Sequence, residues 1–185
     1  MNNLNLLNSD DTLILIIDIQ EKLLNAVFNK EILEKKAEVI AKAASILNIP
    51  VIVSEQYPQG LGDTIVGVKD AIIDNASFFT KSTFNALEVE GLANLLKTLN
   101  RKNIVVLGIE THICVYQTAI ALLSNGYNVN ILLDACGSRA EKEFESALSI
   151  LKLKGAEIKT TEMVLFEFLK NAKHPKFKEI QALIK

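Results

Sequence analysis

Three ionisable side chains follow strand-like segments and could together activate a nucleophile. Asp18 closes the apolar segment TLILIID, Lys81 follows the aromatic stretch SFFT, and Cys114 lies where a strand pattern passes into a helix pattern. The beginning of a helix favours a thiolate over a thiol, and the thiolate is the nucleophilic form of cysteine. A thiol, a carboxylate and an ammonium group gathered in one place would supply a nucleophile, a base and an electrostatic partner.

The electrostatics of proton transfer require all three groups. Reference pKa values of about 8.5 for cysteine and about 3.9 for aspartate leave roughly 6 kcal/mol opposing transfer of the thiol proton to the carboxylate. A helix terminus contributes only about 0.3 to 2 kcal/mol. We therefore expect the Lys81 ammonium to stabilise the Cys114 thiolate, while burial raises the proton affinity of Asp18.

Each of these residues also has an ordinary structural interpretation. Asp18 could be the N-cap of a helix that begins near Glu21. Lys81 could be a solvated loop lysine, and Cys114 could be an inert cysteine in an apolar helix. A carboxylate at the end of an apolar strand is costly unless it is paired, so Asp18 should meet a cation, for which Lys81 is the candidate.

The elements that would position these residues alternate along the chain. Apolar β-branched runs are separated by longer segments of helical period, which is typical of a parallel sheet covered by helices on both faces. Strands are predicted at residues 12–18, 50–54, 77–80, 103–108, 128–134 and 157–160, and helices at 21–47 with a break near Asn29, 86–99, 113–125 and 138–153, with Gly126 and Gly155 as C-caps.

This pattern predicts a single domain over residues 1–185. Its fold class is α/β, a three-layer α-β-α arrangement with a six-stranded, mainly parallel Rossmann-like sheet and helices on both faces. Right-handed crossovers bring the carboxyl ends of the strands to one edge, where open α/β sheets bind small ligands. Residues just after the strands are therefore the candidates for a functional site.

Composition limits the classes of partner. The chain has 185 residues, 49% of them hydrophobic, which is enough for one core without disulfides or a structural metal. With 20 basic and 22 acidic residues, the chain offers no wide basic surface, so nucleic acid is not an expected partner. Two cysteines are too few for a secreted disulfide framework, which favours a cytoplasmic location.

Neither a leader nor a membrane segment is predicted. Residues 1–11 are polar and lack a basic region followed by an apolar one. The longest apolar run near the start, residues 13–17, is far shorter than the ~18 to 20 residues that a membrane helix needs. We expect no membrane partner.

Four motifs carry a resemblance that covers nearly the whole chain. They are IIDIQ (16–20), TKSTFNAL (80–87), GIETHICVYQTA (108–119) and LLDACGSR (132–139). With them the chain resembles the isochorismatase-like cysteine hydrolase superfamily, which includes nicotinamidases and N-carbamoylsarcosine amidases. The segments SEQYPQGLG (54–62) and HPKFKEIQ (174–181) are most similar to the subgroup of isochorismatase domain-containing proteins.

The resemblance implies a catalytic triad. Asp18 becomes the general base, Lys81 the electrostatic partner and Cys114 the nucleophile. A cis peptide at Ile109–Glu110 is implied, which would turn the backbone amides of Glu110 and Cys114 into an oxyanion hole. The expected reaction is hydrolysis of an amide or ureide bond of a small molecule through a thioester, by an amidohydrolase that forms a homo-oligomer, a dimer or larger.

The chain departs from the nicotinamidases at their metal motif. Those relatives carry an Asp-x-His motif soon after the second strand, whereas the corresponding stretch SEQYPQGLG contains no histidine. We therefore expect no metal and no cofactor. The candidate substrate-binding residues share positions beside the strand ends; they are Gln20, Gln56, Tyr57, Phe79, Phe84 and Glu110. Glu110 either faces the substrate or turns away to hydrogen-bond a neighbouring loop.

Other functions are compatible with parts of the pattern. A catalytically idle ligand-binding or interaction module would retain the same fold. A nucleotide-binding protein is disfavoured, because IQEKLLN rather than GxGxxG follows the first strand. A redox sensor would need Cys136 as a second thiol close to Cys114.

Two segments are expected to pack over the body. The stretch 57–67, rich in Pro and Gly, is interpreted as a lid or interface loop. The tail 174–185 places apolar residues on one helical face and should dock on the body or on a neighbouring subunit.

Overall fold

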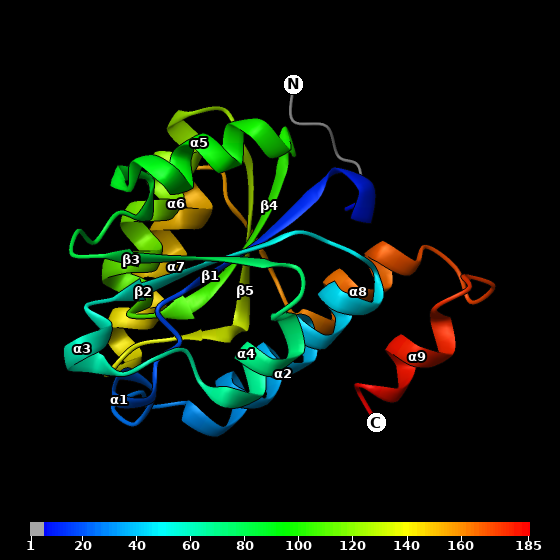
Figure 1. Ribbon diagram of the computed structural model, residues 1–185, viewed down its shortest axis with the longest axis horizontal. Helices are drawn as coiled ribbons and strands as arrows, with labels where there is room; N and C mark the ends of the chain where they lie inside the picture. The colour runs from blue at the N-terminus through cyan, green and yellow to red at the C-terminus, as the bar shows by residue number, and fades with distance from the viewer. Residues whose placement is uncertain (1–5) are drawn as a thin grey trace.

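The computed structural model describes residues 6–185, which form a six-stranded parallel sheet between two layers of helices (Figure 1). The strand order is β3-β2-β1-β4-β5-β6. The predicted fold class is therefore confirmed. The strands are β1 (Thr12–Ile17), β2 (Val51–Gln56), β3 (Ala76–Lys81), β4 (Asn103–Ile109), β5 (Asn128–Gly137) and β6 (Glu157–Lys159).

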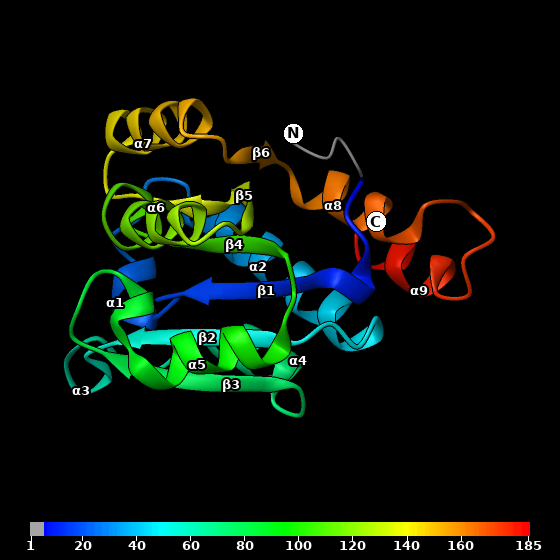
Figure 2. The same ribbon diagram turned by 90° about the horizontal axis from the view of Figure 1, so that it is seen from above.

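Helices cover both faces of the sheet. In Figures 1 and 2, α5, α6 and α7 lie on one side, and α2, α4 and α8 lie on the other. The helices are α1 (Glu21–Leu24), α2 (Lys30–Ile46), α3 (Pro58–Leu61), α4 (Val66–Ile72), α5 (Glu90–Leu99), α6 (Tyr116–Ser124), α7 (Glu141–Leu153), α8 (Thr161–Leu169) and α9 (Phe177–Ala182). None of these described helices has the length and apolar character needed to span a bilayer.

The double cover explains the composition of the central strands. All six residues of β1 are buried, as are six of the seven residues of β4. A strand covered on both faces has no solvent side, so its sequence is continuously apolar rather than alternating. The carboxyl ends of β1, β2, β3 and β4 consequently meet at one edge, where polar residues first appear.

Several predicted boundaries are confirmed. The break near Asn29 separates α1 from α2, and Asn29 is the residue before α2 begins. Gly126 and Gly155 follow α6 and α7 with φ angles of 79° and 101°, a left-handed region in which glycine is favoured at helix ends. The first five residues, part of the segment in which no leader is expected, lie outside the described part of the chain.

Three helices were not predicted from the sequence. Helices α3 and α4 are short; α3 lies within the stretch interpreted as a loop and α4 begins at its end, so both offer little periodicity. Helix α8 is apolar on nearly all sides because it is buried against α2 and β5, and five of its nine residues are buried. A continuous apolar segment lacks the period of an amphipathic helix.

A glycine allows β1 and β4 to approach closely. A Cβ atom built on Gly108 would overlap the carbonyl oxygen of Ile17 on the neighbouring strand. Because Asp18 follows Ile17, this close approach brings the end of β1 beside the turn that follows β4.

The C-terminal tail docks on the body of the protein, which was one of the two predicted positions; the other was a neighbouring subunit. Ile180 on α9 is fully buried, and α9 contacts α2. The ring of Phe177 packs edge-on against that of Phe166, with centroids 6.4 Å apart. The tail therefore contributes to the core rather than hanging free.

Truncation of Ile180 tests this docking. We expect Ile180→Ala to lower the free energy of unfolding by about 2 to 4 kcal/mol, because a fully buried isoleucine loses both its transfer energy and its packing. Ile73→Ala is the matched control, since Ile73 is 60% exposed and should change stability by less than about 0.5 kcal/mol. Urea denaturation measures both; equal effects would show that the tail does not contribute to the core.

Candidate functional site

Asp18 is the first residue after β1, and its carboxylate is fully buried. Its backbone has a φ of 54°, which turns the chain out of the sheet. Oδ2 lies 2.6 Å from the Nζ of Lys81, and Oδ1 accepts a hydrogen bond of 2.8 Å from the hydroxyl of Ser54. The N-cap interpretation of Asp18 is wrong, because Gln20 occupies the N-cap position of α1.

Lys81 is the last residue of β3, and its side chain has no exposed surface. Its ammonium group donates to Asp18 Oδ2 at 2.6 Å, to Gln56 Oε1 at 2.6 Å and to the carbonyl of Thr83 at 3.2 Å. These bonds use all three of its N–H donors. The interpretation as a solvated lysine is therefore wrong, and the charge is held in one position.

The pair spans three strands. In the sheet β2 lies between β3 and β1, so the Lys81 side chain reaches Asp18 across the end of β2. That strand supplies Ser54, which holds the carboxylate, and Gln56, which holds the ammonium. A buried ion pair is tolerated when its remaining hydrogen-bonding capacity is satisfied, and here both partners are.

Cys114 lies in a π-helical turn, Thr111–Val115, between β4 and α6. The thiol-bearing residue is 6% exposed, whereas Cys136 has no exposed surface. Both Asp18 and Lys81 act on the pKa of the Cys114 thiol, so the three predicted residues share one electrostatic environment. Among the described residues Cys114 is thus the cysteine that combines solvent access with a charged pair.

Burial is the largest influence on the ionisation of the Cys114 thiol. Burial and, after it, the Asp18 carboxylate raise the pKa of Cys114 to about 12, against the opposing effect of the Lys81 ammonium. The preference of the helix beginning for a thiolate stays a prediction, and its effect is smaller than the desolvation that raises this pKa. Burial likewise raises the pKa of Asp18, against the opposing effects of Lys81 and Ser54.

The implied cis peptide at Ile109–Glu110 is also wrong, because the described chain contains no cis peptide bond. The chain instead turns at Glu110, which has a φ of 57° and a ψ of 63° in the left-handed region. The chain therefore turns between β4 and the π-helical segment through the left-handed conformation of Glu110, and the peptide bonds there are trans.

Glu110 is engaged with the loop that follows β5. Its Oε1 accepts a 2.7 Å contact from the Nε of Arg139, and its Oε2 lies 3.3 Å from the Nδ1 of His112. The same His112 nitrogen is 3.0 Å from the hydroxyl of Ser138. This geometry matches the interpretation in which Glu110 pairs with a neighbouring loop; a contact of Glu110 with substrate stays a prediction.

Two glutamines hold the chain around Lys81. Gln20 is fully buried, and its Nε2 donates to the carbonyls of Gln56 and Gly62 at 3.0 and 2.5 Å, while its Oε1 accepts from the Gln56 amide at 2.7 Å. Gln56 in turn donates to the carbonyl of Ser82 at 2.9 Å. Both amides therefore organise the loops beside the Asp18–Lys81 pair.

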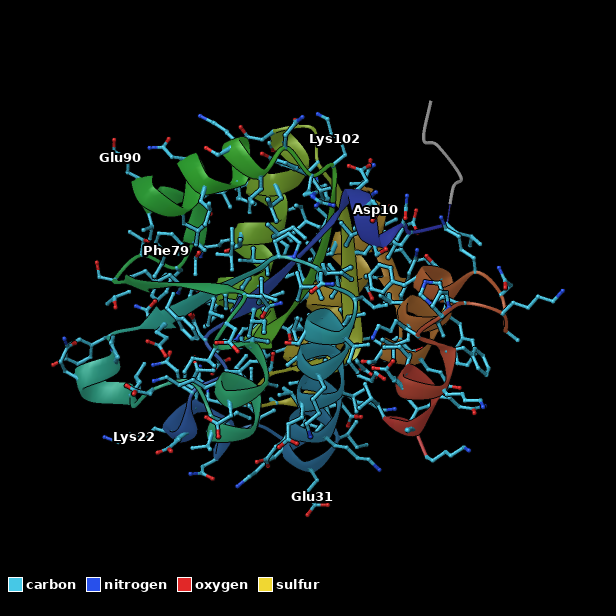
Figure 3. The ribbon with its side chains drawn as sticks, turned by 45° about the vertical axis from the view of Figure 1, so that its right-hand side comes forward. Asp10, Lys22, Glu31, Phe79, Glu90 and Lys102 are labelled. Carbon is cyan, nitrogen blue, oxygen red and sulfur yellow. The ribbon has the colours of Figure 1, made fainter. Side chains whose placement is uncertain are left out.

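The three predicted aromatic lining residues differ in exposure. Tyr57 is 60% exposed with a φ of 37°, and Phe84 is 52% exposed. Phe79 lies on β3 on the side of α5 (Figure 3), where its Cε1 would be 3.0 Å from a Cβ built on Gly91. Phe79 thus packs beneath α5.

The segment 57–67 contains α3 and is tied down at several points. Lys22 donates to the carbonyl of Gly60 at 2.7 Å, and Glu55 accepts two hydrogen bonds of 2.8 Å from Thr64. Asp63 pairs with Lys69 at 3.0 Å. The carboxylates near the nicotinamidase metal position are therefore engaged with protein groups, and residues 6–185 contain no cluster of three or more His, Cys, Asp or Glu side chains arranged to hold a metal.

Sequence reasoning did not identify the supporting role of Ser54 and Gln56. Ser54 is a fully buried polar residue at the end of the apolar run PVIVS. A polar side chain at such a position needs a partner, and that was the available signal. The sequence gave no sign that Gln56 bonds to Lys81, because this contact depends on β2 and β3 being neighbours in the sheet.

The family model described as the Isochorismatase domain matches residues 12–163. The chain belongs to this family. It is 39% identical over 179 residues to isochorismatase domain-containing protein 2 of Xenopus laevis, covering 96% of this chain and 85% of the relative. Its fold is that of the isochorismatase-family hydrolases.

Solved structures agree with this assignment. The chain is similar to the MAR1 ribonuclease of Caenorhabditis elegans, with a TM-score of 0.92 and 34% identity, covering 96% of this chain and 91% of that one. It also shares its fold with a nicotinamidase of Staphylococcus aureus, with a TM-score of 0.71 and 19% identity, covering 80% of this chain and 99% of that one.

The electrostatics of the site predict the reactivity of its thiol. Asp18→Asn removes the negative charge that raises the pKa of Cys114, so we expect iodoacetamide to alkylate this thiol faster at pH 8. Below the pKa, each unit by which the pKa falls increases the thiolate fraction about tenfold and the rate about threefold, because a less basic thiolate is also less nucleophilic. Lys81→Met should slow alkylation, because the opposing positive charge is lost.

Cys136 is the internal control for this experiment. Burial raises its pKa to about 12 as well, but it lies outside the charged pair. If both cysteines of Asp18→Asn react faster, the variant is opening, and peptide mapping of the label distinguishes the two thiols. An unchanged Cys114 rate with an intact fold would contradict the electrostatic coupling.

Proposed function

We propose that this protein is a cysteine amidohydrolase that cleaves a carbon–nitrogen bond of a small amide or ureide through a thioester on Cys114. The proposal is carried by one observation, the fully buried Asp18–Lys81 pair acting on a cysteine that is slightly accessible. Burying two opposite charges away from solvent costs free energy. A buried ion pair beside a potential nucleophile therefore indicates a functional site.

The first half-reaction forms the acyl-enzyme. Asp18 accepts the thiol proton as the sulfur of Cys114 bonds to the substrate carbonyl carbon, so charge is not left on an isolated thiolate. The backbone amides of Glu110 and Cys114 are the candidate donors to the resulting oxyanion. Asp18 then passes the proton to the leaving nitrogen, the carbon–nitrogen bond breaks, and an amine or ammonia departs.

The second half-reaction restores the enzyme. Water attacks the thioester carbonyl and gives a proton to Asp18, the carbon–sulfur bond breaks, and the sulfur regains a proton from Asp18. The net change is hydrolysis of an amide or ureide to a carboxylic or carbamic acid and an amine. The step uses side chains of this chain and water, so the proposal includes no cofactor.

Lys81 acts without moving in this scheme. Its three hydrogen bonds hold the ammonium beside Asp18 throughout. Negative charge that leaves Asp18 for the sulfur and then for the carbonyl oxygen therefore stays close to the same cation. A fixed cation needs no reorganisation at the moment of reaction, which is how preorganised charges lower a barrier. Gln56 is a positioning residue because it holds Lys81.

The residues around the strand ends are proposed to select the substrate. Gln20, Gln56, Tyr57, Phe79, Phe84 and Glu110 remain the proposed lining. RNA is the competing substrate class, because three similar structures are described as a ribonuclease or a putative ribonuclease. A chain with a net charge of −2 gains little from releasing phosphate counterions, so a small amide or ureide is preferred.

Replacement of Cys114 tests the proposal. We expect Cys114→Ala to abolish hydrolysis of any amide or ureide that the wild type turns over in a panel of small substrates, because the variant lacks the proposed nucleophile and the other cysteine, Cys136, has no exposed surface. Cys136→Ala is the matched control and should retain activity. Intact-mass spectrometry of the wild type mixed with an active substrate should show an acyl adduct that maps to Cys114.

Other results of the panel would contradict the proposal. Equal turnover by wild type and Cys114→Ala would remove the nucleophile assignment. Cleavage of an RNA oligonucleotide that depends on Cys114, with no amide or ureide hydrolysed, would replace the substrate class. A complete lack of turnover and adduct across both classes would favour the catalytically idle binding module.

The proposed enzyme is a homo-oligomer. Large apolar side chains are exposed on α7 and α8, with Leu153 86% exposed and Met163 51% exposed. Burial between subunits would remove this apolar surface from water. Light scattering should give a mass that is a multiple of 20.4 kDa, and Leu153→Glu should shift it towards the monomer. A monomeric wild type would contradict the expectation.

A further inference from the structure

The turn that carries Cys114, residues 110–115, is here called the catalytic turn, and its first three residues each contact the loop that follows β5. The contacts are Glu110 Oε1 to Arg139 Nε at 2.7 Å, Thr111 Oγ1 to the carbonyl of Gly137 at 2.9 Å, and His112 Nδ1 to Ser138 Oγ at 3.0 Å. Thr111 and Ser138 are fully buried, whereas Arg139 reaches the turn from the surface with a 62% exposed side chain.

The loop after β5 is also anchored on its other side. The amide of Phe28 donates to the carbonyl of Ser138 at 3.1 Å, and the Nδ2 of Asn29 donates to the carbonyl of Cys136 at 3.0 Å. A Cβ atom built on Gly137 would overlap the side chain of Asn29, so the loop packs closely against this segment. A loop held from two sides is a firm support, and contacts to it can fix the position of the catalytic turn.

Glu110 has a backbone conformation that glycine adopts more readily than other residues. Its φ of 57° and ψ of 63° lie in the left-handed region, which a Cβ atom disfavours. Its carbonyl accepts a hydrogen bond of 2.8 Å from the amide of Ile113, whereas its own amide donates to no backbone carbonyl of residues 6–185. A strained residue persists only where surrounding contacts hold it, so the side-chain contacts of Glu110 keep this free amide in place.

The Glu110 carboxylate brings a negative charge to the same turn. It belongs to the residue whose amide is a candidate donor to the oxyanion, so it lies close to the place where negative charge would develop, and like charges repel. Its Oε2 is buried without a hydrogen-bond partner among the described residues, 3.3 Å from the Nδ1 of His112. The Arg139 guanidinium is the permanently charged cation in contact with this carboxylate, and it offsets the negative charge.

We propose that Arg139 is a positioning residue for acyl transfer at Cys114. Through Glu110 it holds the catalytic turn, and it neutralises the carboxylate that would otherwise oppose the oxyanion. This inference rests on the proposed function, because it concerns the oxyanion donors of that reaction. Exposed ion pairs contribute little to stability, so the loss of Arg139 should change the rate of steps that pass through an oxyanion and leave the fold intact.

Two reagents that modify the same sulfur test this role without knowledge of the natural substrate. p-Nitrophenyl acetate acylates a cysteine through a tetrahedral oxyanion, whereas iodoacetamide alkylates it by direct displacement without one. The release of p-nitrophenolate, after subtraction of the Cys114→Ala background, gives the acylation rate, and mass-spectrometric mapping of the label on Cys114 gives the alkylation rate. Their ratio cancels changes in the pKa or the accessibility of the thiol, which act on both. We expect Arg139→Met to lower this ratio about tenfold.

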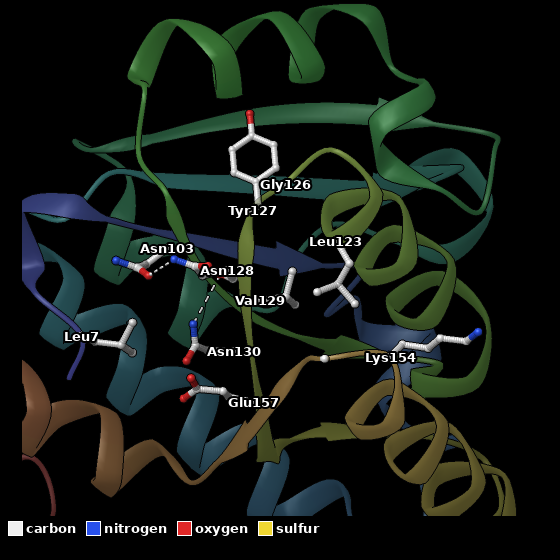
Figure 4. Close-up of a pocket in the computed structure, with 11 residues that line it drawn as sticks. Leu7, Asn103, Leu123, Gly126, Tyr127, Asn128, Val129, Asn130, Lys154 and Glu157 are labelled. Carbon is white, nitrogen blue, oxygen red and sulfur yellow. Dashed lines mark hydrogen bonds between the residues drawn. The ribbon is translucent and has the colours of Figure 1, made fainter. Parts of the chain in front are cut away.

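A double variant and a matched control separate charge from packing. Glu110→Gln combined with Arg139→Met removes both charges, so its ratio should be about threefold higher than that of Arg139→Met alone. A side chain that only packs would not be rescued by a second loss. Lys154→Met is the control, because it also removes an exposed positive charge, but at the opposite end of α7, where Lys154 lines a cavity beside the amino ends of β4 and β5 (Figure 4). It should leave the ratio unchanged.

Each other outcome decides against the proposal in a recognisable way. An unchanged ratio in Arg139→Met, or a double variant no faster than Arg139→Met, would overturn the positioning role and leave acyl transfer at Cys114 standing. Equal losses of both rates, together with labelling of the buried Cys136, would show that Arg139 only stabilises the fold. A wild type that is alkylated but never acylated at Cys114 would overturn the proposed function, and the role of Arg139 with it.

Discussion

The ion pair between Asp18 and Lys81 is the interaction on which the rest of the site depends. Neither side chain is exposed, and their charged atoms are 2.6 Å apart. Removing one member of such a pair leaves an uncompensated buried charge, at a cost of about 3 to 5 kcal/mol. The sheet must therefore hold the carboxyl ends of β1, β2 and β3 in register, because Ser54 and Gln56 complete the hydrogen bonds that make burial of the pair tolerable. The hydrogen bonds that fix the geometry of the site are therefore the same ones that stabilise this edge of the sheet.

The pair also acts on the ionisation of the Cys114 sulfur. Its net charge is zero, so it does not produce the strongly electropositive surroundings that would ionise a cysteine. The carboxylate raises the pKa of Cys114 while the ammonium lowers it, and burial adds the largest effect, so the pKa of the thiol is raised overall. A thiol whose pKa is raised reacts slowly with oxidants and with electrophiles, because the thiolate is the reactive form.

The sequence was sufficient for the fold class and for the identity of the three clustered residues, because both rest on strong local signals. Continuously apolar strands indicate a sheet with two covers, and charged residues at the ends of such strands need partners. The protonation state of Cys114 could not be predicted in the same way, because it depends on how deeply the sulfur is buried. The conformation of the turn at Glu110 and the pairing of Glu110 with Arg139 depend likewise on the distance between β4 and β5 at their ends. Helix α8 was missed because two of its exposed residues, Met163 and Phe166, are apolar like its buried ones, so its sequence shows no amphipathic period.

Protein groups alone satisfy the buried pair. Asp18 and Lys81 bond to one another, to Ser54 and Gln56, and to the carbonyl of Thr83, so neither needs a bound molecule to complete its contacts. A satisfied buried cluster stabilises the fold whether or not a ligand is present. The positions of the two charges are therefore fixed by the fold before any molecule binds, which is the condition for a preorganised site.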